Sequence, residues 1–303
     1  MTTRVLLNPY SNRWNAEKRW PETERALKSA GVEFDLEVSE RAGGLEELAA
    51  RAVREGCKTV VIAGGDGSIG EVVNGLAQSW KPGMKFPVQL GVLPMGSAND
   101  YAFATGLPLD LHAASQIIAA GYTRLVDLCQ CNDRLFLNNS GAALEPYVTT
   151  KQEKIQWIKG AARYVVAAVW AILDKPEWKG TIEWDGGEYK GSISLISLGN
   201  GRRTGGFFMT PHADPFDGKL TMAFGYRPTR RGLFAALPRA FKEGAGNYVE
   251  LPGMREVQCS RARIHLEKPS PAHTDGVLFA EWLTDFNYVV FAQAIPVLLP
   301  KDA

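Results

Sequence analysis

The sequence predicts an α/β N-terminal domain on a mostly parallel sheet, followed by a β-rich, largely antiparallel second domain. Strand and helix patterns alternate through residues 1–128, whereas short strand patterns dominate residues 129–291. A chain of 303 residues is also long enough to bury two cores. We expect the C-terminal segment 292–303 to return to the first domain.

Hydrophobic periodicity and glycine positions define the elements of the first domain. Apolar residues at alternate positions of Val32–Val38 predict a strand. Further strands are expected at Arg4–Leu7, Lys58–Ala63 and Val88–Leu93, with helices at Ala16–Ala30, Gly44–Arg54, Ile69–Trp80 and Leu111–Ala120. Sheets of this kind bind ligands beyond the carboxyl ends of their strands.

The pattern changes near Val126, where short strands separated by turn residues begin. They are expected at Leu128–Cys131, Leu135–Asn138, Thr181–Trp184, Tyr189–Leu198, Leu220–Tyr226, Arg261–Leu266 and Val277–Trp282. Two helices are expected around Ile155–Leu173 and Arg230–Lys242.

Composition excludes several classes of protein. A net charge of +1 argues against a nucleic-acid binder. Four cysteines are too few for a disulfide framework, so we expect buried, reduced thiols. The longest apolar run, Tyr164–Leu173, is far too short to span a membrane, and the first residues do not form a signal peptide. These features predict a cytoplasmic protein whose membrane contact is peripheral.

A glycine-rich loop, Gly64–Gly70, joins a buried strand to a helix. Glycines let a backbone approach a ligand closely, and the N–H groups at a helix N-terminus attract phosphate. Ser68 and Glu71 have the spacing of a capping box. An ordinary capped strand–helix junction is the alternative, but it does not require this many glycines.

The same loop matches the dinucleotide fingerprint at Gly65, Gly67 and Gly70, but its context does not fit. It lies in the third strand unit, and no acidic residue follows about 20 positions later. The Asp66 carboxylate would also repel a pyrophosphate unless magnesium bridged them or the carboxylate handled a proton. The loop therefore favours phosphoryl transfer, and an oxidoreductase is the least favoured class.

Two other loops are expected to face the same ligand. Pro94–Asp100 follows a predicted strand, and Ser97 and Asp100 again have capping-box spacing. Asn8–Asn12 follows the first strand. Because the carboxyl ends of parallel strands share one sheet edge, these loops should converge, although each taken alone could be a plain turn or helix cap.

Seven motifs lie along nearly the whole chain. They are NPYSN at Asn8–Asn12, GGDGSIGEVVNGL at Gly64–Leu76, GVLPMGSANDYA at Gly91–Ala102, VDL at Val126–Leu128, GNGRRTGG at Gly199–Gly206, DPFDGKL at Asp214–Leu220 and HTDG at His273–Gly276. In content and order they resemble the diacylglycerol kinase catalytic domain family, which includes bacterial lipid kinases and sphingosine kinases.

This resemblance implies an ATP-dependent kinase that binds nucleotide between its two domains and phosphorylates a lipid hydroxyl. The residues it implies for nucleotide contact are Asn8, Pro9, Tyr10, Ser11, Asn12, Ser39, Gly64, Gly65, Asp66, Gly67, Ser68, Ile69, Gly70 and Ser97. It also implies a magnesium (Mg²⁺) loop with ligands Asp214, Asp217 and Lys219, the lysine acting through its carbonyl.

One departure from the family pattern concerns catalysis. Where the family has Asp-Gly-Glu, with the glutamate read as general base, this chain has Asp275-Gly276-Val277. Valine cannot take a proton, so another carboxylate must act or the base is missing. We rank Asp66 first, Asp275 second and Glu281 third, because in a continuous strand Glu281 would lie about 13 Å beyond Val277.

Three functions remain open. The first is a lipid kinase, weak or atypical because general-base assistance contributes about 10²–10⁴-fold to rate. The second is a catalytically silent nucleotide- or lipid-binding protein, which Val277 supports. The third is an NAD kinase, which shares the Gly-Gly-Asp-Gly loop, but the Asn8–Asn12 and Asp214–Leu220 motifs argue against it.

A lipid substrate requires access to a membrane surface. Lys151–Arg163 and Arg227–Glu243 combine basic residues with aromatic and apolar neighbours, which suits an anionic interface. The alternative is a pair of core-packed helices with solvated basic faces. His212 and His273 lie beside family motifs and are either cleft residues or ordinary structural histidines. A homodimer is compatible with the sequence but is not indicated by it.

Overall fold

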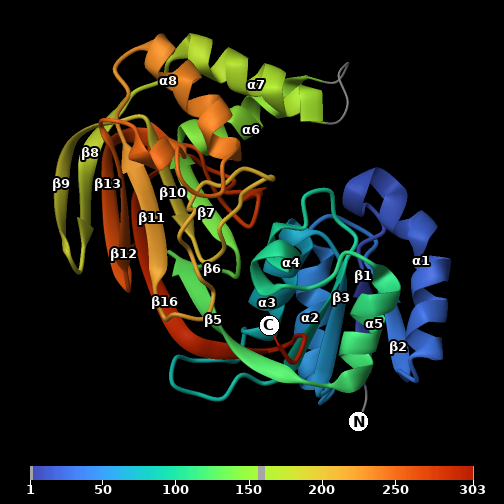
Figure 1. The fold of residues 1–303 in the computed structure, drawn as a ribbon. Coiled ribbons are helices and arrows are strands. Elements are labelled where there is room, and N and C mark those ends of the chain that lie inside the picture. The colour runs from blue at the N-terminus through green and yellow to red at the C-terminus, as the bar shows by residue number, and fades with distance from the viewer. Residues whose placement is uncertain (1–2, 156–160, 303) are drawn as a thin grey trace.

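The computed structural model describes residues 3–155 and 161–302, which form two lobes (Figure 1). The first lobe is built on parallel strands in the order β2-β1-β3-β4. Their bounds are β1 Thr3–Leu7, β2 Phe34–Val38, β3 Thr59–Gly64 and β4 Gln89–Pro94. The helices of this lobe are α1 Ser11–Ser29, α2 Gly44–Arg54, α3 Asp66–Leu76, α4 Asp100–Thr105 and α5 Leu111–Ala120.

The central strands of this lobe are buried on both faces. Val60, Val61 and Ile62 of β3 have no exposed surface, because Val60 and Ile62 belong to one hydrophobic cluster and Val61 to another. Helices cover both sides of the sheet, as expected for a parallel sheet whose strands read as continuous apolar runs. The loops that follow the strands therefore emerge together at one edge.

The second lobe contains two facing layers of strands. One layer has the antiparallel order β12-β11-β10-β7-β14-β15. These strands are β7 Asn139–Ala143, β10 Leu195–Gly199, β11 Leu220–Gly225, β12 Met254–Cys259, β14 Ala272–Thr274 and β15 Val277–Leu278. The other layer contains β5 Thr123–Cys131, β6 Arg134–Phe136, β8 Trp178–Trp184, β9 Gly187–Ile193, β13 Arg261–Ser270 and β16 Leu283–Leu298.

The long strand β16 connects the two lobes. It pairs antiparallel with β5 and β13, and at Val297 it pairs parallel with Leu90 of β4. Figure 1 shows β5 and β16 passing together from one lobe to the other. Hydrogen bonds between strands therefore run without interruption from the parallel sheet into the antiparallel layer.

A group of helices gathers at one end of the second lobe (Figure 1). It consists of α6 Leu144–Lys154, α7 Ala161–Asp174, α8 Arg230–Ala236 and the 3₁₀ turns η1 Leu237–Phe241 and η2 Tyr248–Glu250. Val148 and Ile155 on the α6 side pack with Ala167, Ala168 and Ala171 of α7 in a small hydrophobic cluster of their own.

The predicted fold class is confirmed, whereas some predicted elements are wrong in detail. The segment Tyr189–Leu198 forms β9 and β10, which belong to different layers, because the chain crosses over at Ser194. The strand predicted at Val277–Trp282 ends at Leu278. The helix predicted around Ile155–Leu173 corresponds to α7, whereas α6, which ends at Lys154, was not predicted. Residues 156–160 of the predicted helix, Trp157 and Lys159 included, lie outside the described residues.

Candidate active site

Three loops meet at the carboxyl edge of the parallel strands, as the sequence predicts. Asn8, after β1, donates its side-chain amide to the Ser68 hydroxyl at 2.8 Å, and the Ser11 and Ser68 hydroxyl oxygens lie 3.2 Å apart. The Ser97 hydroxyl donates to the Asn12 side-chain oxygen at 3.0 Å. These bonds join the Asn8–Asn12 loop to both the glycine loop and the loop after β4.

Two glycines bring the second and third loops into backbone contact. A Cβ on Gly65 would lie 2.9 Å from Cα of Gly96, and a Cβ on Gly96 would lie 2.5 Å from Cα of Gly65. Such distances are too short for a side chain, so both positions require glycine. The side chain of Asn99 closes the third loop by binding both the N–H and the C=O of Gly96.

Neither predicted capping box forms. Helix α3 begins at Asp66 after an extended Gly65, so Ser68 lies within its first turn and its hydroxyl binds Asn8 instead. The cap residue of α4 is Asn99 in a left-handed conformation, and Ser97 points to Asn12. In both loops the predicted cap hydroxyl is used for a contact between loops, which sequence spacing does not reveal.

A pocket of about 380 Å³ opens beside these loops, lined by Asn8, Tyr10, Arg41, Ala42 and Glu71. Its volume lies within the range of about 300–1,000 Å³ that is typical of small-molecule sites.

Ser39, a predicted nucleotide contact, is buried after β2, where its hydroxyl donates to the Arg41 carbonyl at 2.8 Å. It therefore shapes the turn that carries Arg41 to the pocket rim.

Asp66 lies at the first position of α3, within the glycine loop. Its Oδ1 accepts the N–H of Tyr101 at 2.9 Å, and burial raises the pKa of its carboxyl. Asp66 is half-buried, whereas Asp100, at the start of α4, is buried. Burial, and after it the negative charge of Asp66, raises the pKa of Asp100 to about 6.

Arg203 and Asp100 form a pair that sequence reasoning did not identify as functional. Arg203 Nε lies 3.2 Å from Asp100 Oδ1, and its guanidinium lies over the ring of Phe103 at 4.4 Å. Asp100 also accepts the N–H of Gly206 at 3.2 Å. This pair joins the second lobe to α4, and the GNGRRTGG motif was the signal that could have indicated it.

Asp275 reaches the site from the second lobe on the tight turn between β14 and β15. Asp275 and Gly276 have positive φ values of 47° and 81°, as a two-residue hairpin turn requires. A Cβ on Gly70 would lie 3.2 Å from Cβ of Asp275, which places the turn directly on α3.

The carboxyl of Asp275 is fully engaged by the backbone. It accepts N–H groups from Leu137, Asn138 and Asn139 at 2.9–3.0 Å. Burial outweighs these bonds and raises the pKa of Asp275 to about 6. The side chain thus ties the hairpin turn to the β6–β7 connection.

Glu281 and Val277 do not lie in one continuous strand, so the predicted strand between them is wrong. Strand β15 ends at Leu278, and Glu281 is exposed in the irregular segment before β16. Val277 itself faces the glycine loop, since a Cβ on Gly67 would lie 3.2 Å from its Cγ2.

The predicted magnesium residues Asp214, Asp217 and Lys219 lie in the loop before β11, packed against β5 and β16. Asp127 of β5 accepts N–H groups from Gly218 in this loop and from Gln293 of β16. Asp217 accepts from the Lys219 N–H and from Gln258, and Asp214 accepts from the Phe216 N–H.

Magnesium binding by this loop stays a prediction. No group of three or more His, Cys, Asp or Glu side chains within the described residues is arranged to hold a metal ion. The predicted donor set has two carboxylates, from Asp214 and Asp217, and one backbone carbonyl, so such a group is not expected of it. No step below depends on a metal held there.

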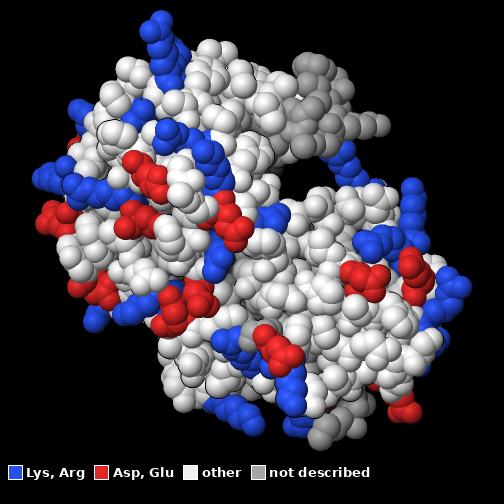
Figure 2. Space-filling model, in the orientation of Figure 1, with Lys and Arg blue, Asp and Glu red and all other residues white. Residues whose placement is uncertain are grey.

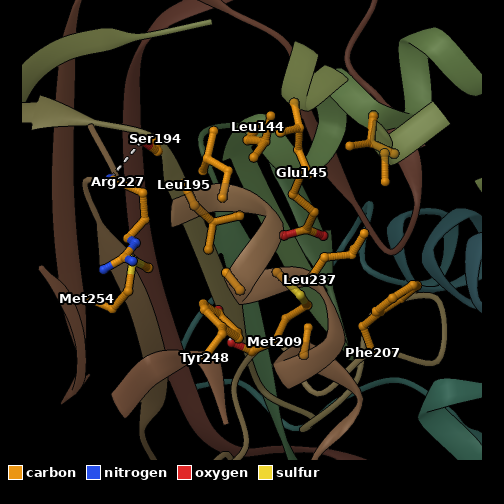
Figure 3. Close-up of a pocket in the computed structure, with 16 residues that line it drawn as sticks. Leu144, Glu145, Ser194, Leu195, Phe207, Met209, Arg227, Leu237, Tyr248 and Met254 are labelled. Atoms are coloured by element: carbon orange, nitrogen blue, oxygen red, sulfur yellow. Dashed lines mark hydrogen bonds between the residues drawn. The ribbon is translucent and has the colours of Figure 1, made fainter. Parts of the chain in front are cut away.

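A second, apolar pocket lies under the helices of the second lobe, and Figure 3 shows its lining. It is a cavity of about 90 Å³ between α6, α7, α8, η1 and β10. Side chains such as Leu144, Leu195, Phe207 and Leu237 line it, together with the carboxyl group of Glu145. Glu145 pairs with His273, whose side chain is buried rather than exposed in a cleft.

The fold and this constellation define a class: two-lobed α/β proteins with a glycine loop at the carboxyl edge of a parallel sheet. Comparison with known families is more specific. The profile of the diacylglycerol kinase catalytic domain matches residues 2–131, and that of the YegS C-terminal NAD kinase beta sandwich-like domain matches residues 140–298. The chain belongs to the diacylglycerol kinase catalytic domain family.

Curated relatives and solved structures agree with this assignment. The diacylglycerol kinase of Staphylococcus carnosus (strain TM300) is 27% identical over 301 residues, covering 99% of this chain and 95% of the relative. That of Staphylococcus aureus (strain bovine RF122 / ET3-1) is 32% identical over 221 residues, covering 72% and 69%.

A crystal structure of a diacylglycerol kinase from Bacillus anthracis str. Sterne shares the fold, with a TM-score of 0.77 at 19% identity, covering 99% of this chain and 98% of that one. The curated relatives are named as kinases, and membership of their family implies ATP as the phosphate donor. Across the described part of the chain, no helix has the length and apolarity needed to cross a membrane.

Proposed function

We propose that this protein is an ATP-dependent lipid kinase that transfers the γ-phosphate to a lipid hydroxyl. The observation that carries the proposal is the position of Asp66. It is a half-buried carboxyl of raised pKa at the amino end of α3, where the three loops of the first lobe meet the hairpin turn of the second. Family membership supports the reaction class.

The glycine loop and the N-terminus of α3 provide the seat for the phosphates of ATP. Unpaired N–H groups at a helix N-terminus attract phosphate, and Gly65 permits the close contact with Gly96 that brings the loop after β4 beside them. The pocket at Asn8, Tyr10 and Arg41 would hold the rest of the nucleotide. Magnesium bound with ATP would supply charge neutralisation to the phosphates.

Asp66 is the residue we assign as general base. As the lipid oxygen bonds to the γ-phosphorus, the bond from that phosphorus to the β-phosphate bridging oxygen breaks, and ADP leaves. Asp66 accepts the hydroxyl proton. Burial raises the pKa of Asp66, which strengthens it as a proton acceptor compared with an ordinary aspartate. Asp275 holds the hairpin turn in place, because its carboxyl oxygens are bonded to backbone N–H groups.

We assign the lipid to the second lobe and its access route to the helical end. Apolar side chains are exposed there on α7, α8 and η1, namely Val165, Val166, Trp170, Leu173, Phe234 and Phe241. Arg230 and Arg231 at the start of α8 are also exposed, and Figure 2 shows basic side chains over this end of the lobe. Apolar and basic groups together suit peripheral contact with an anionic membrane.

Val277 supports a second candidate, a silent nucleotide- or lipid-binding protein. The side chain at this position faces the glycine loop, where the family glutamate would place a carboxylate, and valine supplies no proton acceptor. Phosphoryl transfer depends mainly on positioning and electrostatics, so losing a base at this position would slow transfer rather than abolish it.

The test is incubation of the purified protein with radiolabelled Mg-ATP and a lipid panel in mixed micelles. The panel contains diacylglycerol, sphingosine and a lipid extract of the source cells, and Asp66→Asn serves as the blank. A labelled lipid that disappears in the variant supports the kinase. ATP binding without any labelled lipid would favour the silent binder, and NADP formed from NAD would favour an NAD kinase.

A further inference from the structure

The apolar pocket of the second lobe contains a carboxylate oxygen that forms no hydrogen bond with the described residues of the chain. Glu145, in the first turn of α6, has a side chain that is only 4% exposed. Its Oε1 lies 2.8 Å from Nε2 of His273, whereas its Oε2 is buried and makes no hydrogen bond with any described residue. Figure 3 shows the carboxylate pointing into the space that the lining side chains surround.

The protonation state of the His273 imidazole follows from the hydrogen bond at its second nitrogen, Nδ1. The N–H of Gly276 donates to Nδ1 of His273 at 3.2 Å, so Nδ1 carries no proton. The imidazole is therefore neutral, with its proton on Nε2, and it donates that proton to Glu145 Oε1. His273 has no second donor to offer, and Oε2 stays unsatisfied.

Two other polar side chains of the pocket are bonded elsewhere, although Arg227 Nε is also buried without a hydrogen-bond partner among the described residues. The Tyr248 hydroxyl donates to the Met209 carbonyl, and Arg227 donates through Nη1 to the Pro252 carbonyl. In Figure 3 Arg227 lies at the side of the pocket opposite Glu145. A buried polar atom without a partner is costly, and in native proteins it commonly marks a functional site or a bound molecule.

We propose that Oε2 of Glu145 recognises a hydrogen-bond donor on the acceptor lipid, a hydroxyl or an ammonium group next to the chain that fills the pocket. The inference rests on the proposed function only in calling this ligand the acceptor. A carboxylate oxygen accepts and does not donate, so the partner must bring the proton. Apart from Ser194, Arg227 and Tyr248, the remaining lining is apolar and suits a hydrocarbon chain.

Hydrogen bonds through His273 link Glu145 in the pocket to the hairpin turn at α3. His273 lies between Glu145 and Gly276, which belongs to the turn that carries Asp275. A lipid held at Oε2 is thus one imidazole ring away from that turn. The cavity of about 90 Å³ is smaller than the 300 Å³ or more of typical ligand pockets, so α7 and α8 must move apart as a chain enters.

The test measures binding of three probes of equal chain length to the full chain, without nucleotide, by calorimetry. The probes are dodecanol, dodecylamine and dodecyl methyl ether. We expect the alcohol or the amine, or both, to bind about 10- to 100-fold more tightly than the ether, the effect of one hydrogen bond to a charged group. Equal affinities of all three probes, or a preference for the ether, would overturn the inference.

Two Glu145 variants and one control variant test whether Oε2 causes the difference in probe affinity. In Glu145→Gln the amide oxygen would accept the His273 proton and the NH₂ group would face the pocket, so the preference should shift toward the ether. In Glu145→Leu it should disappear. Leu195→Met, a change of similar volume in the same lining, should alter all three affinities alike. If the Glu145 variants do not fold, the affinities of the three probes for the wild-type protein still test the inference.

These measurements also separate the inference from the proposed function. A preference for donor groups in a protein that labels no lipid would contradict the kinase and leave the role of Glu145 standing. A labelled lipid in a protein that shows no such preference would contradict the role of Glu145 alone.

Discussion

Val277 packs against Gly67: a Cβ on the glycine would lie 3.2 Å from Cγ2 of the valine. The side chain at position 277 therefore reaches from the second lobe to the first turn of α3, next to Asp66. Because Val277 is 37% exposed, a longer polar side chain has room to reach solvent or substrate there. Valine in place of the family's glutamate at position 277 thus lies where the two lobes meet.

Restoring the family residue should increase turnover. Val277→Glu places a carboxylate at this junction, and we expect a rise in kcat of about 10- to 100-fold, within the range of general-base assistance. Val277→Gln is the matched control, since it has the same shape without the ionisable group. An unchanged kcat in Val277→Glu would show that Val277 does not limit the reaction.

The contact between Gly65 and Gly96 should be essential for nucleotide binding. Gly96→Ala would place a Cβ 2.5 Å from Cα of Gly65 and force the two loops apart. We expect at least a tenfold loss in ATP affinity, measured by calorimetry. Gly244→Ala is the control, because a Cβ there meets no atom within 4 Å and φ is not positive. Equal affinities of the two variants would argue against an ATP seat at these loops.

Burial of the Asp100 carboxyl should make the free energy of unfolding fall as the pH rises. The pKa of Asp100 is raised from 3.8 to about 6, so between these values the folded state binds more protons than the unfolded state. Its contribution to the free energy of unfolding is present below pH 4 and is lost as the pH rises through about 6. The upper bound is ~3 kcal/mol, at 1.36 kcal/mol per pKa unit.

Asp100→Asn should remove this contribution. Denaturant unfolding between pH 4 and pH 7 should show a smaller fall in stability for the variant than for the wild type. The amide oxygen can still accept the Gly206 N–H, so the local backbone contact has a substitute. If the free energy of unfolding changes with pH equally in the two proteins, the raised pKa of Asp100 is contradicted.

The helical end of the second lobe should mediate membrane contact. Reversing two charges in Arg230→Glu/Arg231→Glu should weaken binding to anionic vesicles by about 10-fold or more, since each basic residue near such a surface contributes about 1 kcal/mol. Lys18→Glu/Arg25→Glu, on exposed positions of α1, is the control. If both double variants bind like the wild type, the proposed surface is wrong.

The sequence predicts most of the first lobe because its signals are local. The Gly44–Arg54 and Leu111–Ala120 helices appear with the predicted bounds, since glycine positions and apolar spacing specify them. The convergence of the three loops also follows from the topology of parallel strands.

Other features depend on contacts between distant segments. Ser68 has capping-box spacing, yet its hydroxyl is used by Asn8, 60 positions earlier. The pairing of Glu145 with His273 joins residues 128 positions apart, and nothing in the local sequence of either indicates it. Strand β16 continues through both lobes because it pairs with β4, β5 and β13 together, which no single segment reveals.

The most direct test of the account is the initial rate of phosphate transfer from labelled ATP to a lipid hydroxyl in wild type and Asp66→Asn. The variant keeps an oxygen for the Tyr101 N–H, so nucleotide affinity should change little. We predict a fall in kcat of about 10²–10⁴-fold. Equal rates of lipid labelling in the two proteins, or no labelled lipid from wild-type protein that binds ATP, would contradict the account.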